Sequence, residues 1–144
     1  MSGIIVASGR VIVKEIERLC EYSNCVLEKS VLLNLHGATD YYKFCGGKVE
    51  NADKSLIEAA SREVNEEMGF YPKIIDPKPF IFFIREEKSG QSTDIILVHF
   101  LAEQTGKIKP GKDILKWGYQ YLNDLPDKLA PNIVPALTYF GFLK

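Results

Sequence analysis

The chain has 144 residues, of which 46% are hydrophobic and 26% charged, and its formal net charge at pH 7 is −1. This length predicts a single domain, residues 1–144, with room for one core, and the near-neutral charge argues against binding to a nucleic-acid polymer or an anionic membrane, which need a basic excess. No apolar run reaches the ~20 residues of a membrane span and no leader peptide is evident, so we expect a cytoplasmic protein.

The N-terminal part predicts two strands separated by an ambiguous segment. Residues Gly3–Val13 are rich in Ile and Val, and residues 8–10 (Ser-Gly-Arg) indicate a bulge or a tight bend within this strand. Residues Cys25–Leu35 form the second strand candidate. Residues Lys14–Asn24 are polar and fit a strand end, a turn or a short helix.

A helix is predicted after the glycine pair Gly46-Gly47. Ser55 and Glu58 form a capping-box pattern, with Asp53 as an alternative cap, and Gly69 provides a left-handed stop. These signals bound a helix of roughly 13 residues, with an apolar side formed by Leu56, Ala59, Ala60 and Val64.

The C-terminal half alternates strands and loops before a last helix. Strand segments are predicted at Pro72–Asp76, Pro79–Glu86 and Thr93–Glu103, with a hairpin turn at Lys88–Gln91. A polar loop (Gln104–Asp113), an aromatic stretch (Trp117–Leu122) and a helix (Pro131–Phe142) follow. The order of elements predicts a mixed α/β fold in which helices cover a sheet.

The cysteines argue against a structural zinc site. Cys20, Cys25 and Cys45 are odd in number and form no C-x-x-C pair, and the chain has only two histidines. We therefore expect three reduced thiols, two or more of them packed as small hydrophobic groups, in a cytosolic protein.

Three carboxylates lie on one flank of the predicted helix beside Arg62. At about 100° of rotation per residue, Glu63 and Glu67 differ by roughly 40°, and Glu66 lies about 60° to the other side. Like charges at this spacing destabilise a helix unless a cation neutralises them, and Mg²⁺ or Mn²⁺ prefers such oxygen ligands. The pattern therefore indicates a metal site. The alternative is a solvated face with internal ion pairs, such as Arg62 with Glu58 or Glu66.

The carboxylates belong to a longer pattern that begins at Gly47. It resembles the signature of the Nudix hydrolase family, G-x5-E-x7-R-E-U-x-E-E-x-G-U, in which U is aliphatic. The second half matches at Arg62, Glu63, Val64, Glu66, Glu67 and Gly69, with Phe70 in the last place. In the first half Asp53 stands where Glu is expected, residues 51–55 are one residue longer, and Cys45 replaces a proline.

The resemblance implies an α/β/α sandwich with a mixed β-sheet between helices, and a hydrolase that cleaves phosphoanhydride bonds with Mg²⁺, for which Mn²⁺ can substitute. A diphosphate is shielded by its own negative oxygens, so its cleavage needs cations. By resemblance, Glu66 and Glu67 are the main metal ligands. Glu63 either binds a second ion or accepts a proton from the attacking water.

Three further residues receive roles from the same resemblance. Arg62 would pair with a helix carboxylate and hold the cluster in register. Gly46 would bring its carbonyl oxygen to the ions, because glycine permits close approach. Lys48 follows the glycine pair and could meet a phosphate.

The C-terminal part resembles the mutator-type (MutT-like) branch of the family. There an acidic residue ahead of the Trp, here Asp113, adds a metal contact, and an Asn at the last helix, here Asn132, reads the edge of an oxidised purine. Without these roles, Asp113 is a loop carboxylate and Asn132 a helix N-cap. Tyr42 and Phe44 either stack on a base or are buried sheet residues.

The favoured function is hydrolysis of a nucleoside diphosphate linked to another group. The favoured substrate is a nucleoside triphosphate, which is cleaved to a monophosphate and pyrophosphate. An oxidised purine nucleotide such as 8-oxo-dGTP is a candidate. One alternative is an ADP-ribose or nucleotide-sugar pyrophosphatase, and another is a catalytically silent nucleotide-binding module. The sequence leaves open whether the protein is a monomer or a homodimer.

Overall fold

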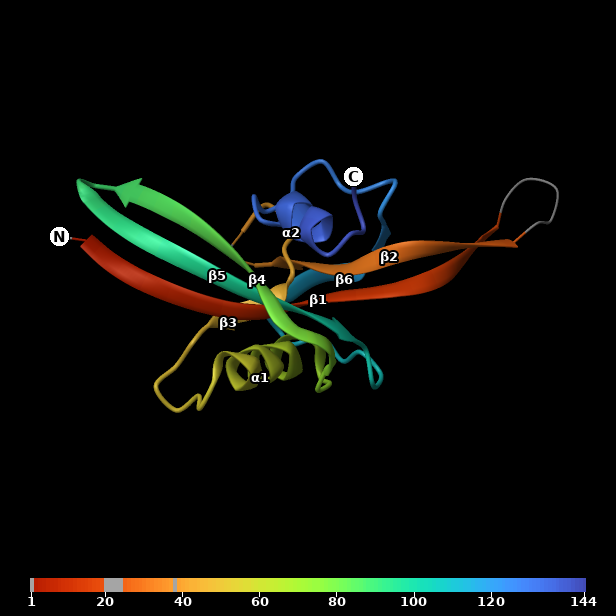
Figure 1. The fold of residues 1–144 in the computed structure, drawn as a ribbon, viewed down its shortest axis with the longest axis horizontal. Helices are drawn as coiled ribbons and strands as arrows, with labels where there is room; N and C mark the ends of the chain where they lie inside the picture. The colour runs from red at the N-terminus through yellow and green to blue at the C-terminus, as the bar shows by residue number, and fades with distance from the viewer. Residues whose placement is uncertain (1, 20–24, 38) are drawn as a thin grey trace.

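A mixed β-sheet lies between two helices in the computed structural model, which describes residues 2–19, 25–37 and 39–144. Helix α1 covers one face of the sheet and helix α2 the other (Figure 1). The elements are β1 (Ser2–Leu19), β2 (Cys25–His36), β3 (Cys45–Lys48), α1 (Leu56–Met68), β4 (Lys73–Lys88), β5 (Gln91–Glu103), β6 (Ile114–Tyr121) and α2 (Ile133–Tyr139). The predicted α/β/α arrangement is confirmed.

The six strands are ordered β4-β5-β1-β2-β6, and β3 pairs with β1 beside this path. The β1–β5 pair is parallel, whereas β1–β2, β1–β3, β2–β6 and β4–β5 are antiparallel. Strand β1 is therefore the centre of the sheet. Its first part pairs with β5 and β3, and its second part pairs with β2.

Strand β1 is longer and straighter than predicted. Its pairing with β5 runs from Ser2 to Ile12 without a register shift, so the predicted bulge or bend at residues 8–10 is wrong. Gly9 serves close packing instead, because a Cβ there would lie 2.5 Å from the carbonyl oxygen of Cys45 and 2.7 Å from Nε2 of His99. The strand alternative for Lys14–Asn24 holds as far as Leu19, and residues 20–24 lie outside the described part.

Helix α1 has the ends that its sequence predicts. The Ser55 hydroxyl accepts the Glu58 N–H at 3.0 Å, and Gly69, at φ 78°, donates its N–H to the Asn65 carbonyl. Asp53 is not the cap of this helix. Its carboxylate accepts the N–H of Glu50 at 2.8 Å and so closes the loop that precedes the helix.

The predicted strands Pro72–Asp76 and Pro79–Glu86 are joined in one strand, β4, at the edge of the sheet. Its pairing with β5 shifts around Asp76 and again before Phe80, where the prolines lack an N–H to donate. The predicted hairpin turn is confirmed. Ser89 and Gly90 have φ of 51° and 76°, as a two-residue type I′ turn requires.

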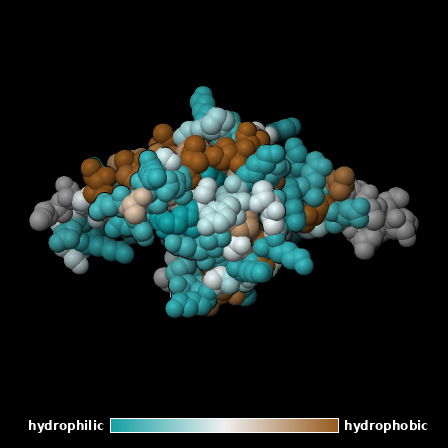
Figure 2. Space-filling view, turned by 90° about the horizontal axis from the view of Figure 1, so that it is seen from below, coloured by the Kyte–Doolittle hydropathy of each residue, from teal (hydrophilic) through white to brown (hydrophobic). Residues whose placement is uncertain are grey.

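The terminal helix is shorter than predicted. Helix α2 spans Ile133–Tyr139, because Gly141 adopts φ 86° and the N–H groups of residues 141 and 142 fold back onto the carbonyls of Thr138 and Leu137. Figure 2 shows a largely hydrophilic face with hydrophobic residues gathered mainly along one edge of the view. Ile81 and Phe83 of the edge strand β4 are among the exposed hydrophobic residues, at 61% and 57% exposure.

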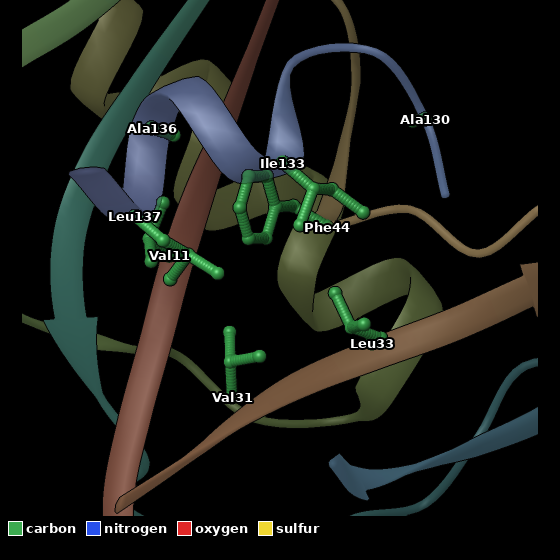
Figure 3. Close-up of a cluster of buried hydrophobic side chains, with 8 residues drawn as sticks. All are labelled: Val11, Val31, Leu33, Phe44, Ala130, Ile133, Ala136 and Leu137. Carbon is green, nitrogen blue, oxygen red and sulfur yellow. The ribbon is translucent and has the colours of Figure 1, made fainter. Parts of the chain in front are cut away.

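Three buried clusters divide the core between the faces of the sheet, and the smallest joins Ala60 of α1 to Val98 and Phe100 of β5. The cluster beneath α2 consists of Val11, Val31, Leu33, Phe44, Ala130, Ile133, Ala136 and Leu137 (Figure 3). The cluster beneath α1 consists of Ile12, Leu32, Cys45, Val64, Met68, Phe70 and Ala102. Neighbours along a strand thus point to opposite faces, which fixes the sheet between the helices. Cys45 is a free, buried thiol, whereas the side chains of Cys20 and Cys25 lie outside the described part.

Candidate active site

The glycine pair of β3 and the carboxylate flank of α1 form two walls of one pocket, of about 360 Å³. The loop before β6 forms the third wall. Lys109 and Gly111 donate their N–H groups to the carbonyls of Met68 and Glu67, at 2.7 and 2.9 Å, which fastens this loop to the end of α1. The pocket lining includes Lys48, Glu63, Glu66, Glu67 and Asp113, together with Gly46 and Gly47.

Arg62 ties the preceding loop to the carboxylates. Its guanidinium binds Asp53 through two hydrogen bonds of 2.9 Å each, and Nη1 lies 3.0 Å from Glu63 Oε1 and 3.1 Å from Glu66 Oε1. Nη2 also donates to the Lys48 carbonyl at 3.1 Å. The guanidinium holds the pKa of Asp53 down at about 2. Asp53 thus anchors Arg62 despite the longer segment at residues 51–55.

Glu67 is the innermost of the three carboxylates and is buried. One of its oxygens accepts the Gly46 N–H at 2.7 Å, and the other lies 3.5 Å from Nζ of Lys43. Burial raises the pKa of Glu67, while the Lys43 charge and the Gly46 hydrogen bond lower it. At the inner end of the carboxylate flank, Glu67 is therefore held by the backbone N–H of Gly46 and by the ammonium of Lys43.

Glu63 lies directly against Gly47. A Cβ on Gly47 would collide with the Glu63 carboxylate, which explains why this position needs a glycine. Burial also raises the pKa of Glu63, and the guanidinium of Arg62 opposes the shift. Glu66 is the outermost of the three, with a side chain 56% exposed.

The three carboxylates share a pocket but do not meet at one point. Within the part of the chain that the structure describes, no three His, Cys, Asp or Glu side chains are arranged to hold a metal ion. The reason is that Arg62 engages Glu63 and Glu66, whereas Lys43 and Gly46 engage Glu67. The donor set nevertheless fits a hard cation, since it is made of carboxylate oxygens that line one pocket, and burial raises the pKa of Glu63 and Glu67.

A second, mainly apolar pocket of about 240 Å³ adjoins the first and shares Lys43, Gly46 and Gly47 with it. Phe44 lines this pocket and is buried in the core, as the second of its two predicted alternatives requires, whereas stacking on a base stays a prediction. Asn132 is 4% exposed, lines the same pocket and makes no side-chain capping hydrogen bond, although it precedes α2.

Tyr42 lies outside both pockets, packed against the core beneath α2, and its neighbour Tyr41 lines the second pocket instead. Sequence reasoning also missed Lys43, His99, His36 and Lys112 as pocket residues. The ring of His99 lies 5.3 Å from that of Phe44, and burial lowers its pKa to about 3, helped by the charges of Lys43 and Arg10. No motif marks these residues, because sheet pairing brings Lys43, His36 and His99 to the site and the loop fastened to α1 brings Lys112.

Residues 25–140, more than half of the chain, match the family model of the NUDIX domain. The chain belongs to the NUDIX family. The prediction of a hydrolase that acts on phosphoanhydride bonds is thereby confirmed at the level of the family. NUDIX hydrolases generally use a divalent metal ion and act on small nucleotide substrates.

Solved structures of low sequence identity share the NUDIX fold. A MutT NUDIX hydrolase from Burkholderia pseudomallei superposes with a TM-score of 0.66 at 19% identity, covering 94% of this chain and 96% of that one. The ORF135 protein of E. coli superposes with a TM-score of 0.57 at 23% identity, covering 96% of this chain and 89% of that one. An Ap4A hydrolase from C. elegans, in a binary complex, superposes with a TM-score of 0.53 at 15% identity, covering 83% of this chain and 81% of that one. No curated protein matches the chain.

Neither helix among the described residues has the length and apolar character needed to cross a bilayer.

Proposed function

We propose that this NUDIX hydrolase is a Mg²⁺-dependent pyrophosphohydrolase that cleaves nucleoside triphosphates to a monophosphate and pyrophosphate. The observation that carries the proposal is the junction of two unlike pockets, one lined by carboxylates and one mainly apolar, at Gly46 and Gly47. A nucleotide has the same two parts, a polyphosphate that needs cations and a flat base that needs an apolar slot.

The carboxylates of Glu63, Glu66 and Glu67, with the Gly46 carbonyl and Asp113, are the groups we expect to hold Mg²⁺, or Mn²⁺ in its place. When bound, the ion supplies positive charge that withdraws electron density from the phosphoanhydride oxygens and assists deprotonation of water. Glu66 has the most exposed of the three side chains, and it would have to leave Arg62 to approach the other two carboxylates.

The chain's own residues divide the remaining work. Glu63 accepts a proton from the attacking water, a role favoured by its raised pKa, which makes it a stronger base than an ordinary carboxylate. Arg62 acts as a positioning residue, since it holds Glu63 and Glu66 against the loop through Asp53. Lys48 lines the carboxylate pocket, where its ammonium would meet a substrate phosphate.

The apolar pocket is the proposed site for the base. Phe44 would pack against the ring, and the Asn132 amide offers both a donor and an acceptor to a purine edge, which suits an oxidised purine such as 8-oxo-dGTP. Tyr42 takes no part, because it lies outside both pockets. Asn132→Leu should raise KM for the preferred purine and leave kcat less affected.

The test is hydrolysis by the purified chain with Mg²⁺ over a panel of nucleotides, with phosphate measured after a phosphatase step. Turnover of a triphosphate that is abolished by Glu66→Gln and by EDTA supports the proposal. Glu58→Gln is the matched control, because Glu58 is exposed on the same helix outside the pocket. A preference for ADP-ribose or a nucleotide sugar over every triphosphate would overturn the substrate assignment.

A second candidate is a catalytically silent nucleotide-binding module. It is favoured by one observation, that the described carboxylates do not converge on a single point. It predicts tight binding of a nucleotide in calorimetry without turnover at any metal concentration or at alkaline pH. The same nucleotide panel therefore separates the two candidates.

We also propose that residues 1–144 form one domain, located in the cytoplasm, that binds no nucleic-acid polymer. Whether it is a monomer or a homodimer is decided by light scattering during size-exclusion chromatography. Subcellular fractionation of expressing cells tests the location. A filter-binding assay with RNA tests the absence of binding to a nucleic-acid polymer.

A further inference from the structure

One cation already occupies the inner end of the proposed metal site. Nζ of Lys43 lies 3.5 Å from Glu67 Oε2 and donates a hydrogen bond of 3.4 Å to the Gly46 carbonyl oxygen. Its side chain is 27% exposed, and it lines both pockets. The ammonium is therefore placed between two groups that a divalent ion would need.

The backbone fixes this placement. Lys43 and Asn34 form a bridge in which each donates its N–H to the carbonyl of the other, at 3.0 and 2.9 Å. Asn34 itself is buried on β2. Lys43 thus starts from a fixed point of the sheet, unlike a lysine on a free loop, so no further backbone entropy is lost when its ammonium stays at Glu67.

Both oxygens of Glu67 have a partner in this arrangement. One accepts the N–H of Gly46 at 2.7 Å, and the other faces the Lys43 ammonium at 3.5 Å. An ammonium and a divalent ion at nearly the same position would repel each other strongly, since the environment is half-buried and weakly screened. An ion that binds to Glu67 must therefore displace Lys43.

We propose that Lys43 is a built-in competitor of the divalent ion: its ammonium holds the position between Glu67 and the Gly46 carbonyl that the ion would take, and it thereby weakens binding of the ion. The inference rests on the proposed function, in that the ion binds in this pocket. It assigns Lys43 as a positioning residue that sets how tightly the protein binds its metal.

The test is titration with Mn²⁺ alone, followed by electron paramagnetic resonance, for the unmodified chain and for Lys43→Met. The variant should bind Mn²⁺ at least about tenfold more tightly, or bind one additional ion, because a nearby positive charge has been removed. Lys112→Met is the matched control. It removes the same charge from the same pocket, but Lys112 has no ion pair with Glu67 among the described residues, so its affinity should change far less. Adding Glu67→Gln to Lys43→Met should remove the gain.

Equal Mn²⁺ titrations for the unmodified chain and Lys43→Met would overturn the inference and leave the proposed function standing. An equal gain in Lys112→Met would also overturn it, because the effect would then be one of net charge. Absence of Mn²⁺ binding in all variants at millimolar concentration would overturn the proposed function and the inference together. Circular dichroism checks folding, and Lys43→Gln replaces the methionine variant if that one unfolds.

Discussion

Gly47→Ala should damage catalysis while sparing the fold. A Cβ at this position would lie 2.7 Å from Oε1 of Glu63 and closer still to the rest of the carboxylate. To regain an ordinary contact of 3.4 Å, that oxygen must move by at least about 0.7 Å. A misplacement near 1 Å costs on the order of a hundredfold in rate, so kcat should fall by roughly ten- to a hundredfold.

The stability of this variant should change little, because φ of Gly47 is not positive and the displaced group is the far end of a side chain. The assay is kcat for the preferred nucleotide together with urea unfolding. Gly106→Ala is the control, since its Cβ would meet Phe70 at an ordinary 3.6 Å. The reasoning fails if Gly47→Ala keeps kcat within about twofold of the unmodified chain, or if it lowers kcat equally in a Glu63→Gln background.

Three further predictions concern other parts of the fold. Arg62→Lys should lower kcat at least about tenfold, because a single ammonium cannot replace the fork that joins Asp53 to the carboxylates; unchanged kinetics would refute the positioning role. Ser55→Ala should lower the free energy of unfolding, measured in urea, by about 1 kcal/mol, because the N-cap hydrogen bond is lost. Lys54→Ala is the control. Ser89→Ala is unsuitable as a control, because the φ of Ser89 is positive. Acid should also destabilise the protein through His99. Its pKa is about 3 in the folded state, below the usual 6.5, so the unfolded chain binds more protons between these values and stability falls as pH drops below 6.5. The loss approaches ~1.4 kcal/mol per pH unit, and His99→Gln should flatten it in urea titrations at several pH values.

Local signals explain which elements could be predicted. The bounds of α1 follow from Ser55 and Gly69, and the β4–β5 turn follows from a short polar run that contains a glycine. Each of these depends on the chemistry of a few consecutive residues. The carboxylate flank was predictable for the same reason, since helical periodicity alone places Glu63, Glu66 and Glu67 together.

Pairing partners explain what could not be predicted. The length of β1 depends on its pairing with β5, which lies far away in the sequence, as well as on β2, and the joined strand β4 depends on β5 across its prolines. Lys43 stands in an unremarkable polar and aromatic run, yet its bridge to Asn34 brings it to Glu67. Asp53 could not be assigned from its one-residue offset, because only the folded loop shows that its carboxylate reaches Arg62.

The carboxylate flank of α1 tolerates its like charges for a different reason from the one that the sequence suggests. Repulsion among the three carboxylates predicts a divalent ion, but the folded chain supplies two cations of its own, Arg62 at the outer end and Lys43 at the inner end. A second cost remains beside this repulsion, because burial raises the pKa of Glu63 and Glu67 and so disfavours their charged forms. A metal ion that enters the pocket would offset this second cost at Glu63, which is also the group whose position a single methyl on Gly47 would disturb.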